Sequence, residues 1–250
     1  MLIHKILLTL LFSIVFSSNL DPKDIINSSI KRLNNIDIKF SANIKSQSLI
    51  SDPINYNLNF ISHHSSIDSN LFYNYVKFNA PIDFKDIEIW LKYDNGNTVS
   101  KKRLPIDNKI TIIENNYDNS NIVELFNFFN LLKDLDNKSL ILKEKKLNQK
   151  KVHLIKASDK KNKKKSINIY IDKDNYCIYK IEWKDRRGRN TKNVVFDNWD
   201  VIDEIYFSTK IIYEDIKNQI KITSILSDIN FNNLNEYDLD KIALGFKFDK

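Results

Sequence analysis

Histidines are the first candidates for catalysis or metal binding, and the sequence contains four of them. His63 and His64 are adjacent, so on a strand their side chains would point to opposite faces and could not bind one metal ion. His153 lies between lysine-rich stretches, where we expect a surface side chain, and His4 falls in an N-terminal apolar segment. The motifs H-E-x-x-H, G-x-S-x-G and S-x-x-K with its partner motifs do not occur. The sequence therefore predicts a protein that is not an enzyme.

Cofactor and metal motifs are also missing from the sequence. Its three glycines, Gly96, Gly188 and Gly245, lie too far apart to form a phosphate-binding loop. Cys177 is the only cysteine, so neither an intramolecular disulfide nor a cysteine-rich zinc site can form. It alternates with apolar residues of a predicted strand, which favours a buried, inert thiol. We expect no cofactor and no bound metal.

Basic residues outnumber acidic ones and give a formal net charge of +7. The sequence is rich in Ile, Asn and Lys, whose codons are A/T-rich, so a high pI is weak evidence for a nucleic-acid partner. The clusters Lys160–Lys165 and Arg186–Arg189 fall between predicted strands, which places them at hairpin tips. Aromatic residues lie on the opposite alternation from the lysines, unlike a nucleic-acid surface. We expect solvated tips, with attraction to anionic lipid headgroups as the alternative.

The first residues have the pattern of an export signal. His4 and Lys5 precede the apolar run Ile6–Phe16, and Ser17 provides a small residue for cleavage. The run is shorter than the roughly 20 residues that a helix needs to cross a bilayer. We predict a cleavable signal peptide over 1–17 and a single domain over 18–250; a membrane anchor is the alternative.

Alternation of apolar and polar side chains dominates the rest of the sequence. Ile36, Ile38, Phe40, Ala42 and Ile44 alternate with polar residues, which is typical of a strand with one solvent-facing side. Similar patterns predict strands over 55–60, 71–78, 86–93, 109–114, 140–142, 152–157, 167–171, 176–183, 192–196, 209–216 and 219–225. Short polar turns such as 172–175 and 185–188 connect them. We therefore expect a mainly β fold with a meandering antiparallel sheet.

Two segments have helical periodicity instead. Residues 24–33 place apolar side chains on one stripe behind Pro22. Residues 121–135 begin with Asn121 and Glu124, a plausible capping box, and are apolar around most of the circumference. Such a helix must be buried on more than one side. It is either a central core helix or a lid over an apolar concavity.

Four stretches resemble the LolA/LolB-like superfamily of periplasmic lipoprotein carriers and outer-membrane lipoprotein-sorting proteins. They are the helix and strand over 25–44, the strand over 76–85 that is interrupted by a proline, the apolar helix over 121–135, and the hairpin over 167–197. The hairpin is similar to the family's D-x-x-G-x-x-T…F-x-D pattern and carries Asp185, Gly188, Thr191, Phe196 and Asp197. One feature departs from the carriers: Asn79 and Ala80, not a basic residue, precede Pro81, and Lys77 is the nearest cation.

The resemblance implies a strongly curved antiparallel half-barrel whose concave face is covered by helices, with an apolar cavity between them. It also implies a monomeric, non-enzymatic periplasmic carrier. Such a carrier binds the acyl chains of lipoproteins or lipids and transfers them toward the outer membrane. Its partners would be the acylated lipoprotein or lipid, an inner-membrane releasing complex and an outer-membrane acceptor, without nucleic acid.

Apolar side chains, not acids or histidines, are therefore the candidate binding residues. The predicted cavity wall consists of Ile38, Phe40, Ile44, Phe60, Trp90 and Trp183, and the predicted lid of Phe126 and Phe129.

Two other functions stay open on the sequence. A periplasmic sensor or scaffold could use the same fold to bind a protein partner, with its concavity filled by its own helices. A hydrolase acting on envelope polymers would need two carboxylates, or a serine and a histidine, facing one cleft. The interior of the fold separates these alternatives.

Overall fold

The computed structural model describes residues 20–32, 36–65, 71–94, 97–105, 110–114, 135, 138–160 and 165–246. The predicted signal peptide lies outside these residues and stays a prediction. Within them, no helix combines the length and the apolar character needed to cross a membrane.

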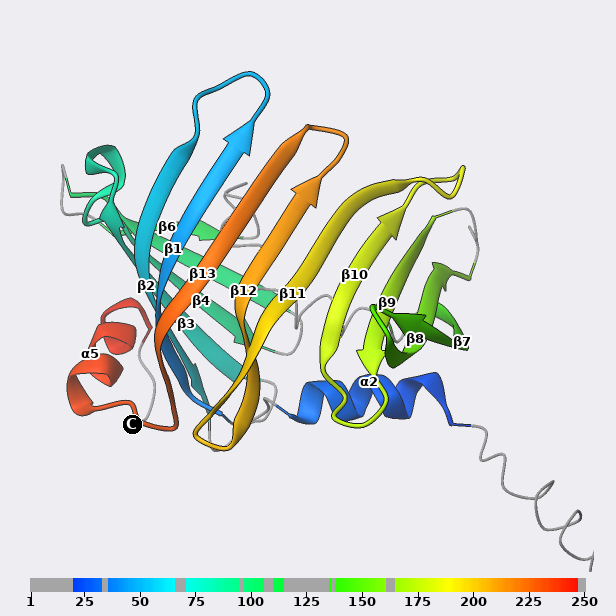
Figure 1. The fold of residues 1–250 in the computed structure, drawn as a ribbon. Helices are drawn as coiled ribbons and strands as arrows, with labels where there is room; N and C mark the ends of the chain where they lie inside the picture. The colour runs from blue at the N-terminus through cyan, green and yellow to red at the C-terminus, as the bar shows by residue number, and fades with distance from the viewer. Residues whose placement is uncertain are drawn as a thin grey trace, which may run out of the picture.

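In the described part of the chain, thirteen strands form one antiparallel sheet in the order β6-β5-β4-β3-β2-β1-β13-β12-β11-β10-β9-β8-β7. The strands are β1 (Ile38–Ser48), β2 (Ile54–His64), β3 (Leu71–Ala80), β4 (Glu88–Asp94), β5 (Asn97–Arg103), β6 (Ile110–Glu114), β7 (Lys138–Leu147), β8 (Lys150–Asp159), β9 (Ser166–Asp172), β10 (Ile178–Lys184), β11 (Asn190–Ile202), β12 (Ile205–Asp215) and β13 (Ile220–Phe231). The described helices are α2 (Pro22–Lys31), the short 3-10 helix η1 (Ile82–Phe84) and α5 (Glu236–Gly245). The sheet is strongly curved and open at β6 and β7 (Figure 1). The predicted mainly β, open half-barrel fold is confirmed.

The sheet consists of two meanders that meet at β1 and β13. Strands β1 to β6 follow one another on one side, and β7 to β13 follow one another on the other. The ladder between β1 and β13 runs from the pair Ile38 and Phe231 to the pair Ser48 and Ile220. Below it, the backbone amide of Asn232 donates to the Asp37 carbonyl at 2.9 Å. Residues from both ends of the chain therefore form the centre of the sheet.

Two irregularities add to the curvature of the central strands. The register of β1 against β13 shifts between Lys39 and Ser41, where Asp228 has a φ of 53°. In β11, Asn198 has a φ of 49°, and its carbonyl accepts a 2.7 Å hydrogen bond from the Thr209 hydroxyl. The register shift between β1 and β13 is a β-bulge, which bends a strand and increases its twist. This bulge helps the sheet to wrap around the side chains on its concave face.

The sheet buries apolar side chains on both faces. The main core collects the inward alternation of nearly every described strand together with Ile25 and Ile26 of α2. In β4, Ile89 and Leu91 belong to this core, whereas Trp90 between them belongs to a second cluster with Ile242 of α5. Since neighbouring residues of a strand point to opposite faces, α2 and α5 cover opposite faces of the sheet, as Figure 1 shows.

Helix α5 packs tightly on the outer face. The Trp90 indole is fully buried, and its Nε1 donates to the Lys241 carbonyl at 2.8 Å. Lys101 Nζ donates to the Gly245 carbonyl at 2.6 Å. Lys39 Nζ lies 2.8 Å from a carboxylate oxygen of Asp238, which is fully buried. These contacts fix both ends of the helix against β1, β4 and β5.

Gly245 is required by the close approach of α5 to β4. A Cβ atom at this position would lie 2.3 Å from Cγ of Trp90. The indole is enclosed and cannot move aside, so we predict that Gly245→Ala lowers the free energy of unfolding by about 1–3 kcal/mol through overpacking. Urea unfolding followed by circular dichroism measures the change.

The matched control is Leu244→Ala, because Leu244 is 60% exposed in the same turn of α5. A substitution at such a surface site changes stability by about 0.5 kcal/mol or less. Equal stability of the two variants would contradict the close packing of α5 on Trp90.

Candidate functional site: an apolar pocket beside helix α2

The predicted wall residues fall into two groups. Ile38, Phe40, Ile44 and Phe60 are buried in the main core, and the rings of Phe40 and Phe60 stack with centroids 4.7 Å apart. Trp183 is partly buried and packs against the same core. Trp90 lies on the outer face under α5 and does not meet the other five. Their role as a ligand-binding wall stays a prediction.

The predicted lid residues Phe126 and Phe129 lie outside the described residues. Of the helix predicted over 121–135, only Leu135 is described, and it is buried in the main core.

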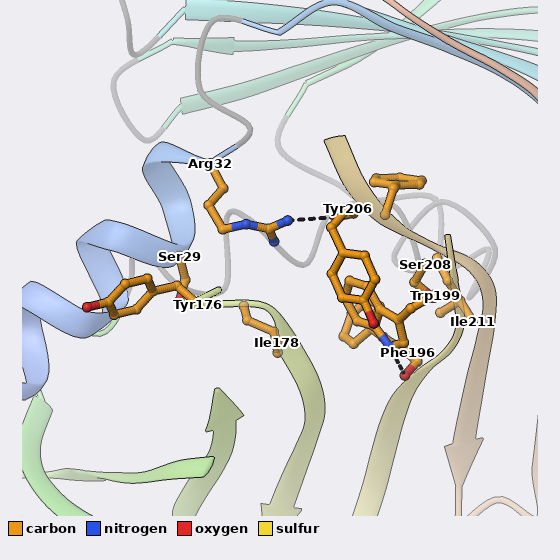
Figure 2. Close-up of a pocket in the computed structure, with 10 residues that line it drawn as sticks. Ser29, Arg32, Tyr176, Ile178, Phe196, Trp199, Tyr206, Ser208 and Ile211 are labelled. Atoms are coloured by element: carbon orange, nitrogen blue, oxygen red, sulfur yellow. Dashed lines mark hydrogen bonds between the residues drawn. The ribbon is translucent and has the colours of Figure 1, made fainter. Parts of the chain in front are cut away.

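A pocket opens where α2 meets the concave side of β10, β11 and β12. Its volume is about 50 Å³. It is lined by Ser29, Arg32, Tyr176, Ile178, Phe196, Trp199, Tyr206, Phe207, Ser208 and Ile211 (Figure 2). Helix α2 and its C-cap supply Ser29 and Arg32 at one side, and the strands with their connecting turn supply a mainly apolar surface.

Aromatic rings form the wall of this pocket that faces α2. Trp199 stacks on Tyr206 with centroids 5.1 Å apart, and it contacts Tyr179 edge-on at 5.3 Å. Its Nε1 donates to the Phe196 carbonyl at 3.0 Å, which satisfies the one polar atom of the indole. Asn198, with its positive φ, precedes Trp199 and helps to set the position of this ring. The wall is therefore rigid and apolar.

The two serines of the lining present little polarity to the pocket. The Ser29 hydroxyl donates to the Ile25 carbonyl at 3.1 Å, within its own helix. The Ser208 hydroxyl lies 2.7 Å from the Asp197 carbonyl and 2.8 Å from the Lys210 carbonyl. Because these hydroxyls already donate their protons to backbone carbonyls, they have no free donor to offer to a ligand. The pocket accordingly suits an apolar occupant.

Arg32 is the charged residue of the lining. It follows α2, and its Nη2 donates a 2.6 Å hydrogen bond to the Tyr206 carbonyl, across the pocket from the helix (Figure 2). Within the described part of the chain, no carboxylate pairs with this guanidinium. Since a guanidinium has five N–H donors, it can bind an anionic group while it keeps the carbonyl contact.

A buried carboxylate supports the aromatic wall from below. Asp172 is buried and accepts a 2.9 Å hydrogen bond from the Tyr179 hydroxyl, which in turn accepts one from Lys150 at 2.8 Å. Burial raises the pKa of Tyr179 to about 12, although the hydrogen bond from Lys150 acts to lower it. Burial also acts to raise the pKa of Asp172, but hydrogen bonds from the backbone amides of Asn175 and Asp174 and from Tyr179 outweigh it, so the pKa lies below its ordinary value. The carboxylate stays ionised and holds Tyr179 against Trp199.

Neither Cys177 nor His153 offers chemistry here. Cys177 is fully buried, so the prediction of a buried thiol is confirmed, and burial raises its pKa to about 11. The expectation of an exposed His153 is wrong, since the residue is 3% exposed. It lies on the same alternation of β8 as Ile155 and Ala157, which pack into the main core, and the surrounding lysines obscured this. Burial, together with the charge of Lys173, lowers the pKa of His153.

The pocket has no residues for acid–base or metal chemistry in its described lining, which contains no Asp, Glu, His or Cys. Over the described ranges as a whole, no group of three such residues is placed to hold a metal ion. What the arrangement can do is enclose an apolar group next to a cation.

Sequence reasoning missed this pocket because its lining comes from a helix end, a turn and a strand segment that follows a residue with positive φ. Tyr176 and Tyr206 each adjoin a connection between strands, and Trp199 follows an irregular residue of β11. A possible signal was the group of aromatic residues around the turns at 173–177 and 203–204.

Solved structures with similar folds cover most of the chain. A DUF1329 family protein from Desulfovibrio piger has a TM-score of 0.69 at 16% identity, over 86% of this chain and 96% of its own. A domain from Vibrio parahaemolyticus described as an outer membrane lipoprotein-sorting protein has a TM-score of 0.69 at 17% identity, over 88% and 97%. A LolA superfamily protein from Nitrosomonas europaea has a TM-score of 0.58 at 14% identity, over 86% and 95%.

The comparison of folds therefore defines the class: the chain has a LolA-like fold, as its sequence predicted. A protein-family model described as an uncharacterized protein matches residues 132–244, less than half of the chain. The sequence matches no curated protein.

Asp172→Asn tests the support of the pocket wall. Because the folded-state pKa of Asp172 lies below its ordinary value of 3.8, the ionised carboxylate stabilises the fold above that pH, and this contribution disappears as the pH falls through the folded-state pKa. At neutral pH we expect the variant to be less stable by about 1–3 kcal/mol. Urea unfolding of both proteins measures the difference.

The difference should shrink well below the ordinary pKa, where Asp172 of the wild type is protonated and resembles the amide. A difference that is independent of pH would show that the charge of Asp172 contributes nothing.

Proposed function

We propose that this protein carries an acyl chain on the concave face of its sheet, with the pocket beside α2 as the entry point. The observation that carries the proposal is the combination of an apolar pocket with Arg32, a cation that no carboxylate neutralises in the described part of the chain. This combination fits an amphipathic molecule with an apolar tail and an anionic group. The structural similarity to a lipoprotein-sorting domain supports the same class of ligand.

The energetics favour an acyl chain over a polar ligand. Burial contributes about 0.8 kcal/mol per methylene, whereas a neutral hydrogen bond contributes only about 1 kcal/mol net. A long chain therefore gains more from the apolar wall than from any polar contact. Arg32 would select for the anionic group and orient it at the mouth of the pocket.

The volume of the pocket limits what it holds in the described conformation. At about 50 Å³, it accommodates a few water molecules, whereas small-molecule sites enclose roughly 300–1,000 Å³. The carrier proposal therefore requires α2 to move outward when a ligand enters. The Arg32 contact with the Tyr206 carbonyl is the polar link across the pocket that such a movement would break.

The setting that we propose is the bacterial envelope. The predicted signal peptide and the similarity to an outer membrane lipoprotein-sorting domain support a periplasmic location. Release from the inner membrane and delivery to the outer membrane would then need a partner at each end, and the acylated lipoprotein or lipid would be the cargo. We propose no chemical step, since the described pocket lining has no acid–base group.

Uptake of a fluorescent long-chain fatty acid tests the proposal, with the matching fatty alcohol as the uncharged probe. We expect Arg32→Gln to weaken fatty-acid binding about tenfold through loss of a charge-assisted contact. Binding of the alcohol should change little, and Arg32→Lys should restore part of the affinity for the acid. Fluorescence titration measures all three.

Lys31→Gln is the matched control, because Lys31 is an exposed cation of α2 immediately before Arg32. Its affinity for the fatty acid should equal that of the wild type. A protein that takes up neither probe, and that is free of lipid in native mass spectrometry after gentle purification, would contradict the carrier function.

A scaffold or sensor function is the second candidate, and the small volume of the pocket favours it. In that case the concavity is filled by the protein's own side chains, and the fold serves to present a surface to a protein partner. The uptake experiment separates the two candidates, because a self-filled interior binds neither probe.

A further inference from the structure

The hairpin between β1 and β2 carries two adjacent aliphatic residues at its tip. Leu49 is 78% exposed and Ile50 is 97% exposed. The turn that holds them is ordered by Ser48, whose hydroxyl oxygen accepts a 3.1 Å hydrogen bond from the Ile50 amide. A fixed turn that presents two large aliphatic side chains to water costs solvation free energy. Their position needs an explanation outside the core.

Further exposed aliphatic residues lie at the same end of the strands. Ile216 follows β12 and is 47% exposed. The turn that contains it leads to Ile220, the first residue of β13, which pairs with Ser48 at the end of β1. Ile82 of η1 is 78% exposed, and η1 follows β3, whose Ala80 pairs with Asn57 of β2. Figure 1 shows these connections along one end of the sheet, away from α2.

Cations lie at the same end of the sheet as these aliphatic residues. The turn between β10 and β11 contains Arg186 and Arg187, and it adjoins β12 through the pairing of Lys192 with Asp215. Lys217 lies in the next turn, directly after Ile216. Among the described residues, no carboxylate pairs with Arg186, Arg187 or Lys217. We call this set, Leu49, Ile50, Ile82, Ile216, Arg186, Arg187 and Lys217, the hairpin rim.

The acids of this end do not cancel the charge of the rim. Asp185 is engaged with Arg189, whose guanidinium lies 2.8 Å away, and it also accepts hydrogen bonds from the backbone of its own turn. Asp52 lies in the tip between β1 and β2, and Asp83 lies in η1 next to Ile82. Asp86, after η1, lies 3.1 Å from Lys77. The rim therefore keeps a positive charge next to its aliphatic side chains.

We propose that the hairpin rim docks on an anionic lipid bilayer. Leu49 and Ile50 would enter the boundary between headgroups and acyl chains, and Arg186, Arg187 and Lys217 would bind the phosphates. Exposed aliphatic residues with flanking cations are the pattern of peripheral membrane association, and cations near an anionic surface are attracted within a Debye length. This site is separate from the pocket beside α2, and it does not depend on the carrier function.

Flotation with lipid vesicles tests the proposal. The experiment uses the full-length protein in the form that is isolated after export. One set of vesicles consists of phosphatidylcholine, and in the other part of it is replaced by anionic phosphatidylglycerol. We expect binding to the anionic vesicles, a loss of that binding at high salt, and little binding to phosphatidylcholine alone. Leu49→Ser with Ile50→Ser should weaken binding at least about tenfold, and Arg186→Gln with Arg187→Gln by about tenfold.

Val201→Ser is the matched control, because Val201 is an exposed aliphatic residue near the tip of the hairpin between β11 and β12, at the other end of the sheet. Its binding should equal that of the wild type. All variants change exposed residues, and circular dichroism and urea unfolding confirm that they stay folded.

Three results would overturn the proposal. One is the absence of binding to anionic vesicles, and another is an equal loss of binding in Val201→Ser. The third is binding that depends on Arg186 and Arg187 but not on Leu49 and Ile50, which would show attraction to the headgroups without entry of the aliphatic side chains. Fatty-acid uptake by the same protein preparations is read separately, so failure of the carrier function leaves this result unaffected.

Discussion

The pairing of β1 with β13 is the contact on which the rest of the structure depends. It joins two meanders, each of which would otherwise expose an unpaired central edge and half of an apolar face. Ile38, Ala42 and Ile44 of β1 and Ile222 and Leu226 of β13 lie in one core. Through this ladder, the inward side chains of strands as distant as β4 and β9 form a continuous concave surface. Helix α2 can cover that surface, and a pocket can form at its margin, only because the two halves are held in register.

The sequence predicted most of the strands because a sheet with a solvent-facing side leaves a period of two in the hydrophobicity. The turns were also predicted, and the turn at 185–188 shows why its residues were recognisable. Gly188 has a φ of +77°, and Asp185 accepts hydrogen bonds from the backbone amides of Arg187 and Arg189. The turn-forming part of the pattern that resembled the LolA-like hairpin thus has a direct structural role. Such local features are encoded by neighbouring residues, so they can be recognised without tertiary information.

Helix α5 and the position of Trp90 were harder to predict. The helix is short and only weakly amphipathic, and its clearest signal is the reciprocal capping of Asn235 and Asp238. In β4, apolar residues on both alternations indicate a strand that is covered on both faces. They do not indicate which segment of the chain covers each face. Trp90 was assigned to the cavity because large aromatic residues suit an apolar wall. The residue on which it packs, Gly245, is far away in the sequence.

The central ladder also determines when the fold can be completed during synthesis. Ile38 pairs with Phe231, 193 residues later (231 − 38), and at a rate of about 5–20 residues per second the ribosome needs roughly 10–40 s to make that stretch. During this interval β1 can pair with β2, while its other edge has no strand to bind. A nascent chain with this topology must be protected from premature pairing with other chains until its last strand emerges. The fold therefore suits a polypeptide that is kept extended until translation ends and folds afterwards as one unit.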